Sequence, residues 1–208
     1  MQSGNTEGTA LDAATKPVRR TFPHRSDEIR KRIQFVTKYR TRSLDLRCMG
    51  LTSLPKEAFG LASLEEIFLN ENNLSDISPE IGRFRSLKRL HLNSNLLTSI
   101  PNELGQLHAL EFLNLPNNNL CILPDCFAEL QFLQHLDIRC NDIRSIPATL
   151  REIESLKTLA VEGNVELESR FGLDGCDARQ ILDTYFTEKP HSHFSRDSVA
   201  RSLDNRAT

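Results

Sequence analysis

The 208-residue sequence contains no apolar run long enough to cross a bilayer, which takes about 20 residues. Residues 1–14 also lack the hydrophobic stretch of a secretory signal peptide. The five cysteines are an odd number scattered along the chain, which is not the pattern of a disulfide framework. These absences predict a protein of a reducing compartment without membrane insertion. The cytoplasm is the expected location, with the nucleus as the alternative.

The chain has no strong charge of either sign, because 26 basic side chains nearly balance 28 acidic ones. A net charge of −2 gives no general reason to expect binding to nucleic acid or to an anionic membrane. The face of a solvated helix explains the local basic cluster near the N-terminus; docking of a partner, nuclear targeting and nucleic-acid binding are the alternatives. The cluster consists of Arg19, Arg20, Arg30, Lys31, Arg32, Lys38, Arg40 and Arg42.

The sequence also lacks the motifs of catalysis and of metal binding. It has no glycine-rich phosphate loop, no Gly-x-Ser-x-Gly elbow and no His-Glu-x-x-His. Cys121 and Cys126 do not have the spacing of zinc ligands, and His191 and His193 have no companion ligand. We therefore expect no catalytic residues, no cofactor and no bound metal, and hence no enzyme.

What the sequence does contain is a repeat of 23 residues, without insertion or deletion, between Thr41 and Gly163. In the first copy Met49 stands where the others have asparagine, so we expect a differently built turn there. Six copies in phase predict a solenoid of stacked repeats. The pattern Leu-x-x-Leu-x-Leu-x-x-Asn-x-Leu, with substitutions in the outer copies, starts at Thr41, Leu64, Leu87, Leu110, Leu133 and Leu156.

The spacing explains how each unit folds. Leu-x-Leu alternates apolar and polar residues, as a short strand with one buried face requires. Leu90 and Leu92 are therefore expected inside, and Arg89, His91 and Asn93 outside. The recurring asparagine has a short amide that can pair backbone groups where the chain leaves the strand. Stacking the units gives a parallel sheet over a continuous core.

The second half of each unit predicts a short helical return segment. A proline follows an aliphatic residue in four units, and the second unit shifts it by one position to Pro79. Proline is tolerated at a first helical position, so we expect it to open the return. Two apolar columns should then pack against the sheet: Ala58, Ile81, Leu104, Phe127 and Leu150, followed by Leu61, Phe84, Leu107, Leu130 and Ile153.

The pattern of residues 87–110 resembles the 23-residue class of intracellular leucine-rich repeats, as in Ras-suppressor and Scribble-like scaffolds and Roco-type proteins. This resemblance covers residues 41–163. It implies an α/β leucine-rich repeat solenoid, a right-handed horseshoe of about six repeats whose parallel sheet lines the concave face. It also implies protein–protein recognition on that face, without catalysis. Extracellular relatives usually have disulfide-rich caps, which this chain lacks.

Both ends of such a stack need a cap, because each would otherwise expose the core. Residues 23–40 predict an amphipathic N-terminal helix with Ser26 as its N-cap. Its buried face should carry Ile29, Ile33 and Val36.

Residues 164–188 predict the C-terminal cap. The repeat frame is lost after Asn164, and a second amphipathic helix follows. Residues 1–22 and 189–208 are polar and are expected to be disordered tails. The apolar face of the second helix should carry Ile181, Leu182, Tyr185 and Phe186.

Functional residues are sought among the outward strand positions, which the repeat leaves unconstrained. Phe68 and Phe112 stand out because a fold needs no aromatic ring on a solvent face, unless the rings merely cover neighbouring strands. Polar neighbours would complete an apolar centre with a polar rim, the usual anatomy of a protein-binding hot spot. His91 and Asp137 lie about 10 Å apart across two units, too far for a catalytic pair. The candidate partner-binding residues are Phe68, Arg89, His91, Phe112, Asn114, His135, Asp137 and Arg139.

These observations favour a non-catalytic adaptor or regulator of intracellular signalling that binds a protein partner on its concave face and is itself a monomer. One alternative is a recognition subunit of a larger enzyme assembly, such as a ligase, a kinase or a phosphatase. The weaker alternative is nucleic-acid binding through the basic N-terminal helix, which predicts affinity that falls steeply with salt.

Overall fold

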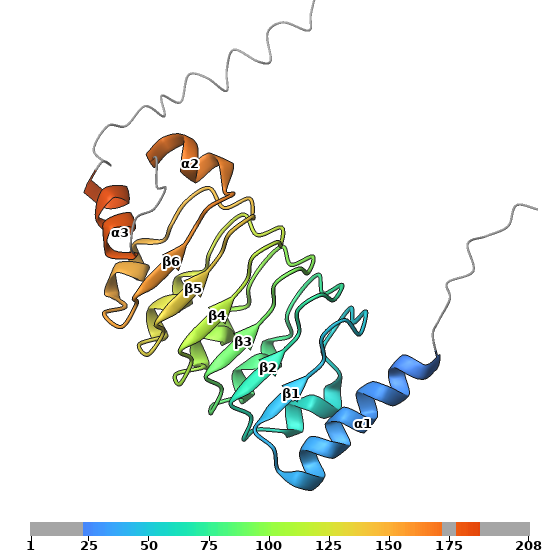
Figure 1. Cartoon of the computed structure of the whole chain (residues 1–208). Helices are drawn as coiled ribbons and strands as arrows, with labels where there is room; N and C mark the ends of the chain where they lie inside the picture. The colour runs from blue at the N-terminus through green and yellow to red at the C-terminus, as the bar shows by residue number, and fades with distance from the viewer. Residues whose placement is uncertain (1–22, 172–177, 188–208) are drawn as a thin grey trace, which may run out of the picture.

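The computed structural model describes residues 23–171 and 178–187. Six short strands form one parallel sheet in chain order. Figure 1 shows them as the rungs of an elongated, curved stack with helices at both ends, so the predicted solenoid is confirmed. The strands are β1 (Ser43–Asp45), β2 (Glu66–Phe68), β3 (Arg89–His91), β4 (Phe112–Asn114), β5 (His135–Asp137) and β6 (Thr158–Ala160).

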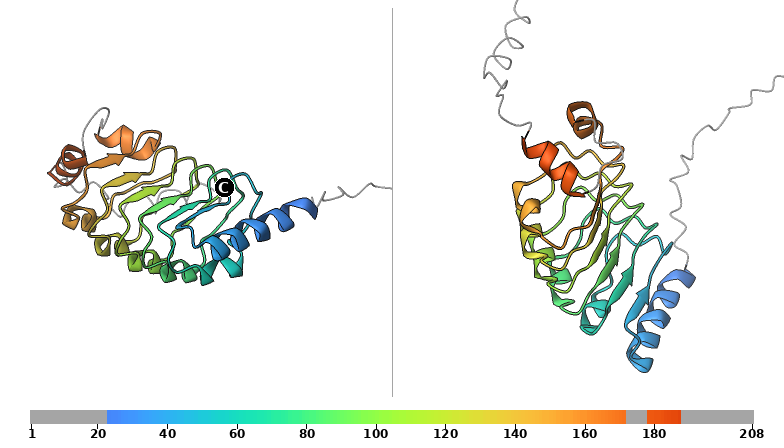
Figure 2. Two further views of the ribbon diagram at one scale, coloured as in Figure 1. Left: turned by 60° about the horizontal axis from the view of Figure 1, so that its bottom comes forward. Right: turned by 60° about the vertical axis from the view of Figure 1, so that its left-hand side comes forward.

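The pairing register of the sheet equals the length of the repeat. Ser43 lies opposite Glu66, and Glu66 lies opposite Arg89, an offset of 23 residues that holds through to β6. Equal positions of successive repeats therefore fall into straight columns across the sheet. The strands line the inner side of the curve and the short helical returns its outer side (Figure 2), so the sheet is the concave face.

The core lies between the strands and the return segments. The middle residue of each strand and the aliphatic residue two positions later are buried, as Leu90 and Leu92 illustrate. Both predicted columns of the return segments are buried as well, except that Leu61 at the N-terminal end is only half-buried. The predicted core is confirmed because the repeat period determines which side chains face inward.

The return segments are short 3₁₀ helices. The sequence predicts proline at the first position of each helix. In four repeats this is wrong, because the proline lies just before the helix. In η2, Pro79 does hold the first position, because Ser78 occupies the cap and its Oγ accepts a hydrogen bond from Glu80 N at 3.3 Å. The helices are η1 (Lys56–Gly60), η2 (Pro79–Arg83), η3 (Asn102–Gln106), η4 (Asp125–Glu129) and η5 (Ala148–Glu152).

A ladder of buried asparagines ties each repeat to the one before it. Asn118 Nδ2 donates to Leu115 O in its own repeat at 2.9 Å and to Leu92 O of the preceding repeat at 3.1 Å. Its Oδ1 accepts from Leu97 N, again in the preceding repeat, at 3.0 Å. The predicted pairing of the asparagine amide with backbone groups is confirmed. The sequence does not predict that two of the three contacts go to the preceding repeat. The same three contacts are made by Asn72, Asn95, Asn141 and Asn164.

This direction explains why Met49 occupies the asparagine position of the first repeat. An asparagine there would reach back to a repeat that the stack does not have. Asn72 serves the first turn, and its Oδ1 accepts from both Met49 N and Leu51 N at 3.0 Å. The turn does differ from the others, as predicted, since it has this second donor and Gly50 adopts a φ of +64°.

Helix α1 (Pro23–Tyr39) covers the N-terminal end of the stack. Ile33 and Val36 are buried and Ile29 is partly buried, as the sequence predicts. The predicted N-cap is wrong, because the helix begins at Pro23 and Ser26 lies within it. Proline favours the earlier start, since its fixed φ suits the first helical turn and its missing N–H is not needed there.

Two helices close the C-terminal end: α2 (Val165–Phe171) and α3 (Ala178–Thr187). The repeat pattern does not predict α2, which follows directly on the last ladder asparagine. In α3, Ile181 and Leu182 are buried and Phe186 packs against the core, as predicted. The Tyr185 side chain and the two expected tails, residues 1–22 and 189–208, lie outside the described residues.

Within the described ranges, none of the helices has both the length and the apolar character needed to cross a membrane. The four cysteines in these ranges, Cys48, Cys121, Cys126 and Cys140, are free thiols.

Candidate protein-binding face

Three columns of outward side chains cross the concave face, and all eight candidate residues belong to them. The first column contains Ser43, Glu66, Arg89, Phe112, His135 and Thr158. The second contains Asp45, Phe68, His91, Asn114, Asp137 and Ala160. The third lies two residues further along each repeat and contains Arg47, Asn70, Asn93, Pro116, Arg139 and Glu162.

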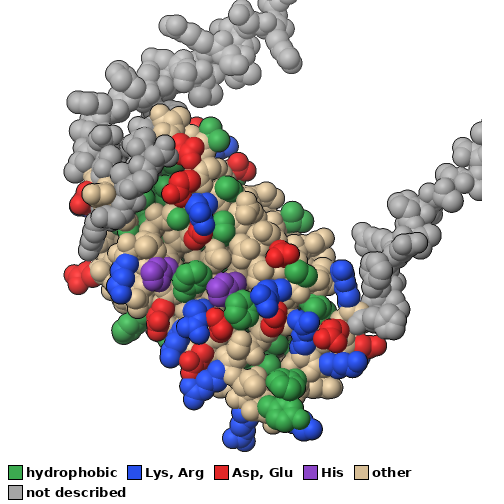
Figure 3. All heavy atoms as spheres, viewed as in Figure 1, with side chains coloured by type: hydrophobic (Ala, Val, Ile, Leu, Met, Phe, Trp, Pro, Cys, Tyr) green, Lys and Arg blue, Asp and Glu red, His purple; other side chains and the backbone are tan. Residues whose placement is uncertain are grey.

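Four rings from these columns form one continuous row, which we call the ring ladder: Phe68, His91, Phe112 and His135. The first two rings stack with centroids 4.6 Å apart. His91 and Phe112 follow at 5.2 Å, and Phe112 and His135 at 5.8 Å. The row passes from the second column to the first, so it crosses the sheet diagonally. Figure 3 shows two histidines alternating with hydrophobic side chains on this face.

His91, in the middle of the ring ladder, is largely shielded from solvent. Its Nε2 is buried and has no hydrogen-bond partner in the described part of the chain. Glu66 Oε1 lies 3.7 Å away, beyond hydrogen-bond length. Burial lowers the pKa of His91 below its ordinary value of 6.5, and the Glu66 carboxylate opposes only part of this shift. The ring is therefore neutral at pH 7.

The ion pairs of this face link neighbouring side chains to one another. Arg89 Nε donates to Glu66 Oε1 at 2.6 Å across β2 and β3. Arg139 Nε and Nη2 donate to the two carboxylate oxygens of Asp137 at 3.0 and 2.7 Å. His135 also has a partner, since its Nδ1 lies 2.7 Å from Thr158 Oγ1. The charges around the ring ladder thus largely neutralise each other.

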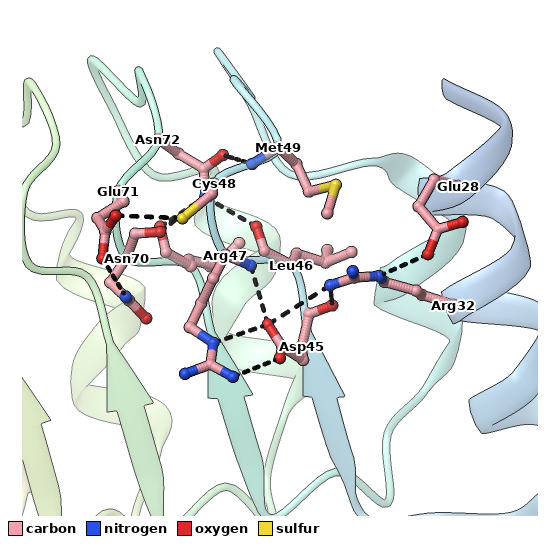
Figure 4. A network of polar contacts seen from close by, with 11 residues as sticks. Glu28, Arg32, Asp45, Leu46, Arg47, Cys48, Met49, Asn70, Glu71 and Asn72 are labelled. Atoms are coloured by element: carbon pink, nitrogen blue, oxygen red, sulfur yellow. Dashed lines mark hydrogen bonds and ion pairs between the residues drawn. The ribbon is translucent and has the colours of Figure 1, made fainter. Parts of the chain in front are cut away.

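The first repeat carries the same arginine–aspartate clamp as the fifth. Arg47 Nε and Nη2 donate to Asp45 at 3.0 and 2.7 Å (Figure 4), and these bonds lower the pKa of Asp45. The Arg47 guanidinium carbon lies 5.0 Å from the centre of the Phe68 ring. This contact is a cation–π interaction that closes the N-terminal end of the ring ladder.

Asn114 places an amide beside the rings. It lies opposite His91 in the register, and its Nδ2 donates to Asn93 Oδ1 at 3.4 Å. Its Oδ1 is buried and has no hydrogen-bond partner within the described residues.

The structure brings the eight candidates into one surface. Arg89 lies opposite Phe112, and Asn114 separates His91 from Asp137 across three strands. Asp137 and Arg139 pair with each other at the C-terminal flank. Among residues 23–171 and 178–187, no group of three or more His, Cys, Asp or Glu side chains is arranged to hold a metal ion.

The candidates chosen from the sequence leave out four residues of this surface: Asp45, Arg47, Glu66 and Asn93. A signal for the clamps was present, since Leu-Asp-Leu-Arg-Cys at residues 44–48 recurs as Leu-Asp-Ile-Arg-Cys at 136–140. Residues two apart on a strand share a face, so each Asp-x-Arg predicts a local ion pair. The Glu66–Arg89 pair follows from the register in the same way.

Comparison with protein families agrees with this geometry. The family description "Leucine rich repeat" matches residues 40–82, and a second description of the same name matches residues 86–107 and 109–130. This chain is a leucine-rich repeat protein. Proteins of this kind generally use the concave surface of the solenoid for binding, and the ring ladder lies on that surface of the leucine-rich repeat array.

One solved structure supports the same fold at low sequence identity. The leucine-rich repeat domain of the type III effector XopL aligns with a TM-score of 0.59 and 18% identity, over 74% of this chain and 62% of that one. A Leptospira interrogans leucine-rich repeat protein aligns with a TM-score of 0.43 and 25% identity, over 65% of this chain and 52% of that one. A chain of the BIR3–SERK2 complex of Arabidopsis thaliana aligns with a TM-score of 0.47 and 31% identity, over 51% of this chain and 60% of that one. The chain thus spans less than two thirds of each, and no curated protein matches it.

Proposed function

We propose that this leucine-rich repeat protein is a non-catalytic recognition module that binds a partner protein on its concave face and acts as an adaptor or regulator in intracellular signalling. The observation that carries the proposal is the ring ladder. Two phenylalanines and two histidines form a connected row on a face where the fold requires no ring. The partner should therefore bury the ring ladder.

The charges of the face support recognition by shape and apolar contact. Asp45, Glu66 and Asp137 are each paired with an arginine on the same face. Intramolecular pairs of this kind add little long-range attraction, so binding should depend only weakly on salt. A salt-insensitive, ring-dependent interaction is the signature that we expect.

Affinity purification of the full chain from its native cell, followed by calorimetry with the captured protein, tests this proposal. Phe68→Ala and Phe112→Ala should each weaken binding by about 1 kcal/mol or more. Phe132→Ala is the matched control, because Phe132 is 64% exposed and lies outside the strand columns. Equal affinity of all three variants and the original chain, with circular dichroism unchanged, would refute the placement of the site.

The same purification distinguishes an adaptor from a recognition subunit of a larger enzyme assembly. A ligase, kinase or phosphatase recovered at fixed stoichiometry would favour the subunit role. Partners recovered at variable stoichiometry would favour the adaptor. The ring ladder would serve either role, and for both we propose that the chain itself is a monomer.

We place this role in the cytoplasm, with the nucleus as the alternative. The free thiols of Cys48, Cys121, Cys126 and Cys140 support a reducing compartment. Nucleic acid is not part of the proposal, because Arg32 and Arg42 of the basic N-terminal cluster already form ion pairs with carboxylates.

A further inference from the structure

The N-terminal end of the molecule differs in charge from the rest. Residues 23–42 hold seven Lys or Arg against two Asp or Glu, a net charge of +5. Residues 43–208 contain 16 Lys or Arg and 24 Asp or Glu, a net charge of −8. A charge difference of this size within one chain attracts an acidic ligand to the N-terminal end and repels it from the remainder.

A groove runs between α1 and the edge of the sheet at this basic end. Its volume is about 560 Å³. The side chains of Phe35, Val36 and Leu44 give it an apolar lining, and polar groups from both elements form the rest. The groove is separate from the ring ladder, which starts at Phe68 on the next strand.

The strand that borders the groove has an edge to which no other described strand is paired. β1 is the first strand of the sheet and pairs with β2 on one side only. Leu46 N donates to Phe68 O and Glu66 N donates to Arg42 O, so the even-numbered residues direct their backbone groups to β2. Ser43 and Asp45 therefore direct theirs to the groove, where Arg32 Nη1 already donates to Asp45 O at 2.9 Å. The two N–H groups at this edge are the kind to which an extended chain adds.

Two aromatic rings on α1 are exposed without serving the cap. Phe35 and Tyr39 are 56% and 59% exposed, and their ring centroids lie 4.6 Å apart. The cap is made by Ile33 and Val36, which are buried where the helix packs on the stack. Phe35 lines the groove, and its pairing with Tyr39 extends this apolar surface along the helix. Lys38 Nζ lies 5.2 Å from the centre of the Tyr39 ring.

The charges on the groove wall are unequally compensated. Arg32 lies between two carboxylates, with Nε 3.1 Å from Glu28 Oε1 and Nη1 3.6 Å from Asp45 Oδ1 (Figure 4). Asp45 is also held by Arg47. Lys31, by contrast, lines the groove, is exposed, and takes part in none of the ion pairs between described residues. It is the cation available to a ligand.

We propose that this groove is a second binding site, and that its occupant is an extended acidic peptide segment of a partner protein. The segment runs along the edge of β1 and accepts hydrogen bonds from the N–H groups of Ser43 and Asp45. It places an apolar side chain against Phe35 and directs carboxylates to Lys31 and Lys38. A bilayer would use neither the groove nor the strand edge, which is why the geometry favours a peptide.

Phage-displayed random dodecapeptides selected on the full chain, with counter-selection on a Phe35→Ser variant, provide the probe. Phe35 is exposed, so this substitution should leave the fold intact. The enriched peptides should share a net negative charge and one large apolar residue. Enrichment of neutral or basic sequences, or no sequence specific for the original chain, would overturn the proposal.

Fluorescence anisotropy with the enriched peptides then tests the two contacts. Phe35→Ser and Lys31→Glu should each weaken binding about tenfold, and added salt should reduce the effect of Lys31→Glu. Phe132→Ser and Lys157→Glu, matched substitutions elsewhere on the surface, should leave the affinity unchanged. Loss of affinity in Phe112→Ala instead would assign the peptides to the concave face and overturn the second site.

Two further probes decide between classes of ligand. A single-stranded RNA oligonucleotide and phosphatidylserine vesicles should show no binding that depends on Phe35 at physiological salt. Binding of either probe that Phe35→Ser abolishes would overturn the peptide proposal, as would self-association of the chain that the same variant abolishes.

Discussion

Two rows of side chains run along the stack and follow opposite rules: one crosses the second to sixth repeats, and the other crosses the second to fifth. In the asparagine ladder, five copies of one residue make the same hydrogen bonds to the backbone, and all are buried. In the ring ladder, two residue types alternate, the row changes column, and every ring is partly open to solvent. The first row is set by the geometry of the stack, which is the same in every repeat. The second row exists only in this combination of repeats, as expected of a surface that distinguishes one partner from another.

The largest test of this contrast exchanges the same residue type on the two sides of the sheet. Phe127 on the return side is fully buried, so Phe127→Ala should lower the free energy of unfolding by about 3–5 kcal/mol. Phe112→Ala on the concave side removes only contacts with neighbouring side chains and should cost about 1 kcal/mol or less. Urea denaturation of both variants measures the difference. Equal losses would mean that the ring ladder is part of the core.

The next largest effect is expected within the asparagine ladder. Asn118→Ala leaves Leu97 N without its buried acceptor and removes one of the two amide donors from each of Leu92 O and Leu115 O, so it should cost roughly 3 kcal/mol. Asn119→Ala, one residue later and exposed, should change stability by less than about 0.5 kcal/mol. Denaturation midpoints that fall equally in the two variants would contradict the role of the amide.

An intermediate effect is expected where two return helices approach closely. A Cβ added to Gly105 in η3 would lie 2.7 Å from Cys126 O, so Gly105→Ala should destabilise the chain by about 1–3 kcal/mol. At Gly60 in η1 no atom lies within 4 Å of the added Cβ. Gly60→Ala should therefore be neutral or stabilising by about 0.5 kcal/mol. Thermal unfolding of both variants checks the sign as well as the size.

The smallest effect concerns pH and belongs to the ring ladder. Burial lowers the pKa of His91 below 6.5, so in acid the unfolded state binds a proton that the folded state resists. Stability should therefore fall as the pH drops below about 6.5, until the pH reaches the lowered pKa of the folded state. His91→Gln should lose this part of the pH dependence in denaturation measured from pH 7.5 to 5. An identical pH profile for the variant would show that the imidazole is not shielded.

The sequence predicts most of the fold because its period translates directly into register. Once Leu90 and Leu92 are assigned inward, the positions of Arg89 and His91 follow, and the offset of 23 residues repeats that assignment in every unit. Ser26 was wrong as the N-cap because capping preferences are weak beside the conformational preference of proline, and the helix begins at Pro23. The helix α2 was missed because it lies where the period ends.

The candidate site is less predictable, because it depends on contacts between columns. The sequence places Phe68 and Phe112 outward, in two different columns. It does not reveal that the His91 ring contacts both of them. It also does not reveal that Arg32 in the groove wall is paired with carboxylates, whereas Lys31 remains available to a ligand. Side-chain orientation on an open surface is set by several neighbours at once, and no single period encodes it.

The backward reach of each ladder asparagine gives the stack a temporal order as well as a spatial one. The turn of one repeat is completed by an amide that lies in the following repeat, as Asn95 Oδ1 accepts from Leu74 N at 3.1 Å. During synthesis, each repeat that leaves the ribosome must wait for the asparagine of its successor before its backbone is satisfied. The turn of each repeat can therefore be completed only after the next repeat has emerged, and Met49 marks the one position with no predecessor to complete.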